Sequence, residues 1–139
     1  MIDPTRTPEG CAHPWGDAAT PYDEIGGDDA VRALVDDFYD YMDAESPVVR
    51  AMHPDDLDES RDKLYEFLSG WLGGPPIYHE KRGHPRLRAR HMPFAIDQRA
   101  VDEWLRCMGL AMDKRGVAGA LRAFMDAKLD HLANFMRNR

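Results

Sequence analysis

The chain has 139 residues, 43% of them hydrophobic and 31% charged, which suits one compact domain with its own core and argues against a disordered chain. Acidic residues outnumber basic residues by 25 to 18, and the net charge of −7 disfavours a general attraction to nucleic acid or to an anionic membrane. Two widely spaced cysteines exclude a disulfide scaffold and a Cys-rich zinc module. Because the sequence shows neither a long apolar run nor an apolar leader, we expect a cytoplasmic protein without a membrane segment.

The beginning of the chain is rich in residues that interrupt regular structure. Residues 1–21 contain four prolines and two glycines, which predicts a flexible N-terminal extension. Helical patterning starts after this segment, so the folded domain is predicted to cover residues 22–139.

Two helices are predicted in the first half of that domain. Apolar residues recur at helical spacing over residues 28–45 and form one stripe. The next helix is predicted from Asp56 and Glu59, which have the spacing of a capping box at a helix start. An apolar stripe follows them, and the sequence Gly-Gly-Pro-Pro at residues 73–76 is expected to end that helix.

Residues 73–96 show little periodicity and predict a long loop, with a short helical turn beginning at Pro85. Loops of this length inside a compact domain are often functional. Asp97 is the predicted N-cap of a further helix, which Gly116 and Gly119 end, and a last helix runs toward the C-terminus. No segment shows the alternation of a strand, so the predicted fold class is all-α.

The long loop concentrates positive charge and histidine. Between His79 and His91 the only acidic residue is Glu80. The basic and histidine side chains of this stretch are His79, Lys81, Arg82, His84, Arg86, Arg88, Arg90 and His91. Such a segment in an acidic chain either binds a local anionic partner or is solvated and paired with the protein's own carboxylates, and the residues alone leave both interpretations open.

His91 differs from its neighbours because it precedes the apolar run of residues 92–96, where the loop turns inward. An imidazole at such a place can bind a metal, although a core histidine bonded to a backbone carbonyl is the more common case. A zinc hydrolase that uses the loop histidines is a weaker alternative, because their spacing is irregular and no HExxH sequence is present.

Tyr39 and Trp104 lie on the inward stripes of two different predicted helices. Each side chain carries a polar tip that needs a hydrogen-bond partner when it is buried. Either both are ordinary core residues bonded to backbone oxygens, or both tips point at one bound ligand.

Several motifs together resemble one known family from about Tyr22 to the C-terminus. They are Phe38-Tyr39, His53-Pro54-Asp55-Asp56-Leu57, Trp71-Leu72-Gly73-Gly74-Pro75, the block Gly83-His84-Pro85-Arg86-Leu87-Arg88-Ala89-Arg90-His91-Met92-Pro93-Phe94, and Trp104-Leu105-Arg106-Cys107-Met108. With these motifs the chain resembles the group II truncated haemoglobins. The resemblance implies a truncated globin fold, a two-over-two helical sandwich around haem b, with residues 22–139 as the haem-binding domain.

The resemblance also implies the residues around the iron. His91 matches the proximal ligand, and Tyr39 and Trp104 match the two distal residues typical of the group. His53 matches the corner position after the third helix of the family, and Ser60 and Leu64 match two positions of the distal helix.

Residues expected at the edge of the haem follow from the same resemblance. Arg90, Tyr78 and Lys63 match positions associated with the haem propionates, and Phe94 closes the proximal motif. The two carboxylates of a haem would pair with basic side chains of the loop through charge-assisted hydrogen bonds.

The function that the resemblance implies is binding of O2 and other diatomic ligands, with NO, CO and peroxide as further ligands. Two hydrogen-bond donors beside the ligand favour slow O2 release, which suits redox chemistry such as NO dioxygenation or peroxidase activity better than bulk oxygen transport. Such chemistry needs an electron donor that the sequence does not identify. A haemless globin-like sensor or interaction module is the alternative, and a homodimer is left open.

Overall fold

The structure is a computed structural model that describes residues 5–139, so residues 1–4 of the expected extension lie outside the described residues. The described part contains helices and no strand, which confirms the all-α prediction. The helices are α1 (Pro21–Ile25), α2 (Asp28–Glu45), α3 (Pro47–Arg50), α4 (Asp58–Trp71), α5 (Ile77–Arg82), α6 (Leu87–His91), α7 (Gln98–Lys114) and α8 (Gly119–Met136). None of these helices is long and apolar enough to cross a membrane.

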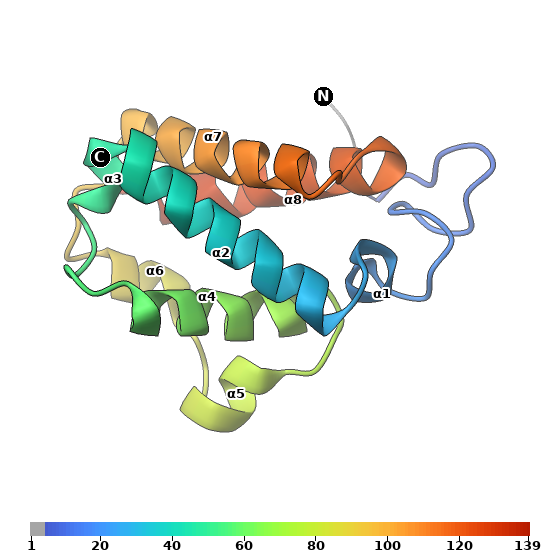
Figure 1. Ribbon diagram of the computed structural model, residues 1–139, viewed down its shortest axis with the longest axis horizontal. Helices are drawn as coiled ribbons and strands as arrows, with labels where there is room; N and C mark the ends of the chain where they lie inside the picture. Colours follow the sequence, from blue (N-terminus) through green and yellow to red (C-terminus); the bar gives the residue numbers. More distant parts are fainter. Residues whose placement is uncertain (1–4) are drawn as a thin grey trace.

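The long helices form two pairs, α2 with α4 and α7 with α8, and α2 packs directly on α7 (Figure 1). The most completely buried side chains lie where these helices meet: Leu34, Phe38, Leu68, Met108, Met125 and Leu129. The short helix α6 packs on α8, whereas α4 packs on α2 and α5. Helices α4 and α6 therefore belong to different parts of the sandwich.

The predicted helix starts hold to within one or two residues. Helix α2 has the predicted bounds, and the Asp97 carboxylate accepts a hydrogen bond from Ala100 N (2.9 Å) as the N-cap of α7. Asp56 accepts from the backbone N–H of Asp58 (2.9 Å), but the N-cap of α4 is Leu57 and no side chain caps this helix, so the predicted cap at Asp56 is wrong by one residue. Glu59 forms an ion pair with Lys63 (3.1 Å) and thus makes a different contact from the one that a capping box requires.

The segment predicted as one long loop contains two short helices, α5 and α6. Six and five residues are too few to show a periodic stripe, which is why the sequence pattern did not reveal α5. Gly83 ends α5 with a φ of +82°, and α6 begins after Arg86, which adopts a left-handed φ of +48°. The predicted turn at Pro85 is therefore present, two residues later than expected.

The end of the expected flexible extension is packed on the domain. The Trp15 ring lies edge-on to Phe124 (centroids 5.4 Å apart), and Trp15 Nε1 donates to the Ala18 carbonyl (2.8 Å). The Tyr22 N–H donates to the Leu72 carbonyl at the end of α4 (2.9 Å). The structure differs from the expectation here because an aromatic side chain and backbone hydrogen bonds outweigh the chain-breaking composition.

Candidate functional site

Two apolar clusters meet at Trp104 of α7. The larger cluster holds the core of the four long helices, with half-buried Leu64 of α4 packed against it. The smaller cluster surrounds Val101, with half-buried Leu87 of α6 and Leu132 of α8 beside it. Trp104 contacts both clusters, and the apolar faces of α4 and α6 are each only partly covered.

Tyr39 and Trp104 both contact the phenyl ring of Phe38. The ring of Phe38 is 5.0 Å from that of Tyr39 and 5.1 Å from that of Trp104, measured between centroids. Tyr39 is only 5% exposed, and burial raises the pKa of its hydroxyl above the ordinary value, so the hydroxyl keeps its proton. Among residues 5–139, nothing accepts a hydrogen bond from the Tyr39 hydroxyl or from Trp104 Nε1.

Neither the Tyr39 hydroxyl nor Trp104 Nε1 is among the fully enclosed polar atoms without a partner, so both face space that another molecule can reach, and Trp104 is half-buried. Polar tips of largely buried aromatic side chains usually have a hydrogen-bond partner. A bound ligand with an electron-rich atom would supply the missing acceptor. Of the two interpretations of Tyr39 and Trp104, the contacts thus favour donors to one ligand over core residues bonded to backbone oxygens.

His53 joins this group from the corner after α3. Its ring meets that of Tyr39 edge-on at 5.8 Å, and its Nδ1 lies 2.9 Å from the Val49 carbonyl, which assigns the Nδ1 proton. Burial lowers the pKa of His53, and the nearby positive charge of Arg50 acts in the same direction. The His53 ring is therefore held neutral, with Nε2 available.

His91 is the last residue of α6 and is half-buried. Its Nδ1 lies 2.5 Å from the Leu87 carbonyl one turn earlier, so Nδ1 carries the proton and Nε2 is left as an acceptor. The Asn138 amide donates to the carbonyls of His91 (3.3 Å) and Phe94 (2.9 Å) and fixes the turn behind the imidazole. A backbone-bonded histidine and a metal-binding Nε2 are thus compatible at this position.

Of the two residues predicted on the distal helix, Leu64 packs against the larger cluster. Ser60 and Leu64 lie one turn apart on α4 and are both half-buried. Lys63, which the resemblance assigns to a propionate, forms an ion pair with Glu59 on its own helix.

The other residues predicted at the haem edge are divided between the core and the surface. Tyr78 of α5 is buried and meets the ring of Phe67 edge-on at 6.5 Å. Arg90 and Phe94 are exposed on the α6 side. The structure thus brings Tyr39, His53 and Trp104 together and leaves the predicted edge residues spread over α4, α5 and α6.

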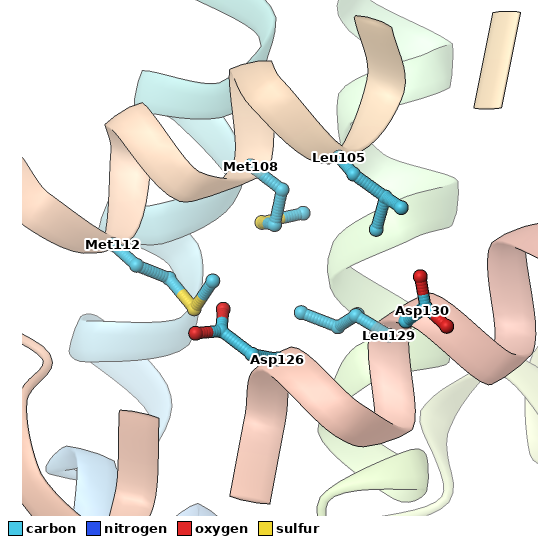
Figure 2. A pocket seen from close by; sticks show the side chains of 6 residues that line it. All are labelled: Leu105, Met108, Met112, Asp126, Leu129 and Asp130. Carbon is cyan, nitrogen blue, oxygen red and sulfur yellow. The ribbon is translucent and has the colours of Figure 1, made fainter. Parts of the chain in front are cut away.

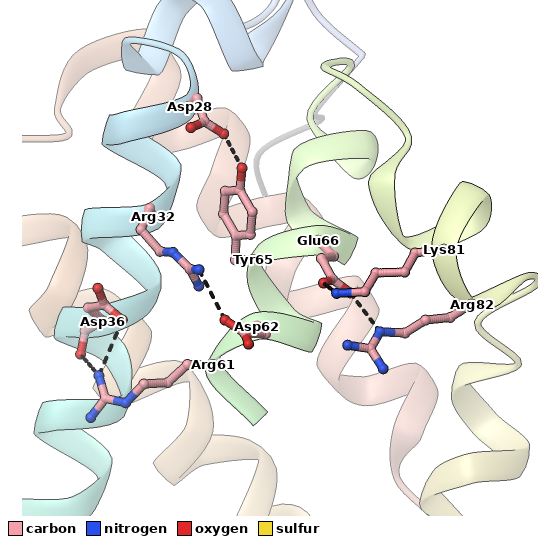
Figure 3. A network of polar contacts seen from close by, with 9 residues as sticks. All are labelled: Asp28, Arg32, Asp36, Arg61, Asp62, Tyr65, Glu66, Lys81 and Arg82. Carbon is pink, nitrogen blue, oxygen red and sulfur yellow. Dashed lines mark hydrogen bonds and ion pairs between the residues drawn. The ribbon is translucent and has the colours of Figure 1, made fainter. Parts of the chain in front are cut away.

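Ion pairs hold α4 in place from both sides, as Figure 3 shows. Arg61 bonds to Asp36 (3.4 Å) and Asp40 (2.8 Å) of α2, and its guanidinium lies 5.7 Å from the centre of the Tyr39 ring. Farther along, the Tyr65 hydroxyl donates to Asp28 at the start of α2. These contacts fix the distance between α4 and the helix that carries Tyr39.

Glu66 is a buried carboxylate that sequence reasoning did not single out. It lies on α4 between Lys81 (3.0 Å) and Arg82 (2.6 Å) of α5. Burial alone would raise the pKa of Glu66, but the hydrogen bonds from Arg82 and Lys81 outweigh it and keep the pKa below its ordinary value. Periodicity gave no signal for it, because Glu66 lies off the apolar stripe of the second predicted helix and faces α5 instead. Two cations of the basic loop are therefore paired with the protein's own carboxylate.

Two pockets on the described residues are lined by side chains other than those predicted at the site. Figure 2 shows one of about 200 Å³ between α7 and α8, lined by apolar side chains and by Asp126 and Asp130. The other, of about 230 Å³, lies between Trp71 of α4 and the end of α8, beside Lys128 and Phe135. The two carboxylates of the first pocket would repel an anionic group such as a propionate.

The residues around Trp104 fit a flat apolar group with anionic edges. The partly covered faces of α4 and α6 offer two apolar walls, His91 offers a ring nitrogen, and Arg90 lies at the exposed edge. Haem has this chemistry. Within residues 5–139, no three His, Cys, Asp or Glu side chains are grouped as metal ligands, so the zinc alternative has no site there.

Comparison with known proteins agrees with this chemistry. The model of the bacterial-like globin family matches residues 20–138. Group 2 truncated haemoglobin YjbI of Bacillus subtilis is 44% identical over 119 residues, which cover 86% of this chain and 89% of that protein.

Solved structures give the same result. The group II truncated haemoglobin of Bacillus anthracis superposes with a TM-score of 0.84 at 43% identity, covering 88% of this chain and 93% of that chain. The truncated oxygen-avid haemoglobin of Bacillus subtilis superposes with a TM-score of 0.81 at 44% identity, covering 86% and 99% respectively.

Proposed function

The chain belongs to the bacterial-like globin family, whose truncated haemoglobins share its two-on-two helical fold, and on that premise we propose that it holds haem b through His91 and retains O2 for redox chemistry. Membership of the globins implies haem and the binding of diatomic ligands. The ligand contacts and the reaction are the parts proposed here. The observation that carries them is that buried Tyr39 and half-buried Trp104 both contact Phe38 and that their hydrogen-bond donors lack an acceptor among the described residues.

His91 is the proposed iron ligand because its Nδ1 is already bonded to the Leu87 carbonyl, which directs the Nε2 lone pair away from α6. When bound, haem supplies an iron centre that takes up diatomic gases and exchanges single electrons. Arg90 and Tyr78 are the proposed partners of the propionates, with Leu64, Ser60 and Phe94 on the walls. Lys63 would have to leave Glu59 in order to join them.

The distal side chains decide how long a ligand stays. The Tyr39 hydroxyl and Trp104 Nε1 donate hydrogen bonds to a polarised diatomic ligand, and His53 orients Tyr39 from the corner. Each hydrogen bond to a charged group contributes about 1.5–3 kcal/mol, so two slow ligand release by about two to four powers of ten if they add. The oxygen-avid relative from Bacillus subtilis supports this proposal.

A protein that releases O2 slowly is poorly suited to transport and well suited to using the O2 it holds. We propose oxidation of nitric oxide as the reaction: NO, O2 and one electron give nitrate. The roles of the chain are to hold O2 through Tyr39 and Trp104 and to exclude water with the apolar walls of α4 and α6. Peroxide reduction is the second redox reaction that the same donors would assist.

The test is steady-state consumption of NO by the haem-loaded protein in aerobic buffer with a reductase system. The expected result is one nitrate per NO consumed, with a rate that falls when Tyr39 is replaced by phenylalanine. Nitrate formation no faster than with free haemin, in a sample with an intact Soret band, would refute the reaction. Turnover of peroxide with a phenolic dye in place of NO would favour the second reaction.

A further inference from the structure

The cations of this protein fall into two groups that occupy different surfaces. Of its 18 Lys and Arg residues, ten form ion pairs with carboxylates within the described residues. The described cations outside those pairs are Arg6, Arg86, Arg88, Arg90, Arg99, Lys128, Arg137 and Arg139. Five of these eight lie on or beside α6 and after α8, which is a strong concentration in a chain with a net charge of −7.

Contacts between distant parts of the chain bring α6 and its Arg88 beside the segment that carries Arg137. Helix α6 packs on α8, and Arg88 Nη1 donates to the carbonyls of Phe135 (2.6 Å) and Arg137 (3.1 Å). Arg137 Nη1 donates to Gln98 at the start of α7 (2.9 Å). We name the surface formed by Arg86, Arg88, Arg137 and Arg139 the arginine face, and leave out Arg90 because it is a proposed partner of the propionates.

The same surface carries two of the exposed large apolar side chains of the described residues. Met92 and Phe135 are exposed by 50% and 53%, and the Arg88 guanidinium lies 5.9 Å from the centre of the Phe135 ring. Aromatic residues, Met and Arg are enriched in protein interfaces, whereas solvated charged surfaces lack the apolar part. The composition of the arginine face is that of a protein-binding surface.

The location of the face adds a functional argument. Helix α6 presents Arg88 and Arg90 to solvent and ends in half-buried His91, the proposed iron ligand. A protein bound at the arginine face would therefore sit close to the proposed iron site. The proposed oxidation of NO consumes one electron for each NO, and this electron has to enter from outside the chain.

We infer that the arginine face is the docking site of an acidic one-electron carrier protein, of the flavodoxin or ferredoxin class. The inference rests on the proposed function. The carrier is oxidised by one electron, the ferric iron is reduced to ferrous by the same electron, and no covalent bond forms or breaks. A carrier with a small acidic patch meets only the arginine face, whereas an extended anionic surface would also meet the acidic remainder of the chain.

The test measures binding of a purified acidic flavodoxin to the haem-loaded protein by calorimetry at low and high salt. We expect Arg86→Glu and Arg137→Glu each to weaken binding at least tenfold, and salt to weaken binding to the wild type. Arg6→Glu is the matched control, because it makes the same charge change at another cation outside the ion pairs, in the segment at the opposite end of the molecule from α6 (Figure 1). It should change the affinity by less than twofold.

Several results would overturn the docking site. The first two are no binding of flavodoxin at low salt and an Arg6→Glu effect equal to that of the two arginine-face variants. The third is that Arg86→Glu and Arg137→Glu lose binding to phosphatidylglycerol vesicles but bind flavodoxin normally. The fourth is a dimer of this protein that the two substitutions dissociate. If charge reversal impairs folding, Arg86→Gln and Arg137→Gln should also weaken flavodoxin binding, by a smaller factor than the Glu variants. Failed binding with an intact Soret band contradicts only the docking site, whereas a colourless protein that refuses haemin contradicts the proposed function.

Discussion

The rings of Tyr39 and His53 meet edge-on, with centroids 5.8 Å apart and planes at 83°. They come from α2 and from the corner after α3, and Trp104 of α7 reaches the same place through Phe38. Three separate segments thus place aromatic rings around Phe38 and Tyr39, and the first prediction depends on this arrangement.

Replacing Trp104 with phenylalanine should remove one of the two donors and keep most of the apolar contact with Phe38. Loss of a hydrogen bond worth about 1.5–3 kcal/mol predicts O2 release faster by about ten- to hundredfold. Stopped-flow displacement of O2 by CO measures the rate. Trp15→Phe is the control, because it deletes an indole N–H that donates to Ala18 far along the chain from the site. An unchanged rate in W104F would remove Trp104 from the list of donors.

Replacing His91 with glycine should leave the helices in place and abolish stable haem binding, because no other described group offers a ring nitrogen at the end of α6. Added imidazole should restore the Soret band by filling the vacated space. The absorbance ratio of the Soret band to the protein band gives the readout. His79→Gly, a change at an exposed histidine of α5, should bind haem normally. A normal Soret band in H91G without imidazole contradicts the assignment.

Glu66 should make the protein sensitive to acid. Its pKa is depressed in the folded state, so its contribution to stability is present above the ordinary carboxyl value of 4.5 and is lost as the pH falls through the lower folded value. Glu66→Gln should cost about 1–3 kcal/mol at pH 7, because Arg82 and Lys81 lose a charged acceptor.

The wild type and Glu66→Gln should have the same free energy of unfolding at a pH below the folded pKa of Glu66. Urea unfolding at pH 7 and at decreasing pH, followed by circular dichroism, measures both effects. Glu80→Gln on the exposed side of α5 makes the same chemical change without a buried pair and should have little effect. An equal loss of stability in Glu66→Gln and Glu80→Gln would contradict a stabilising role for the buried ion pairs of Glu66.

Gly74 should not tolerate a larger residue, because an added Cβ would lie 2.4 Å from the Tyr22 ring. Gly74→Ala must push Tyr22 away from the end of α4, and we expect a loss of about 1–3 kcal/mol from overpacking. Gly109→Ala is the control within a helix, where the nearest atom would be Arg122 Nη2 at an ordinary 3.5 Å. That substitution should stabilise by about 0.5–1 kcal/mol, and thermal melts should show opposite signs for the two variants.

The long helices could be predicted from the sequence because their signals are local. The apolar stripe of α2 and the Asp97 cap of α7 involve residues within a few turns of each other. The packing of Trp15 on Phe124 and the pairing of Glu66 with Arg82 join residues from different elements, and no periodicity records which cation or aromatic ring will be near. Such contacts depend on the tertiary arrangement.

The candidate site was predictable to a similar extent. Tyr39 and Trp104 were identified as inward polar tips, and the structure places both beside Phe38. For His91 the residue pattern alone favoured a histidine bonded to a backbone carbonyl, and this bond to Leu87 is present. The proposed role of Nε2 came only from the family resemblance, because the hydrogen bond of Nδ1 does not determine what Nε2 binds.

One amide near the C-terminus secures the turn that follows α6. Asn138 donates to both His91 and Phe94, and the Ile96 carbonyl in turn accepts the Asn138 N–H (2.8 Å). Proteolytic trimming of two residues would cut all of these links while sparing every long helix. Preparations nicked there during storage should accordingly fade in colour well before their far-ultraviolet spectrum changes.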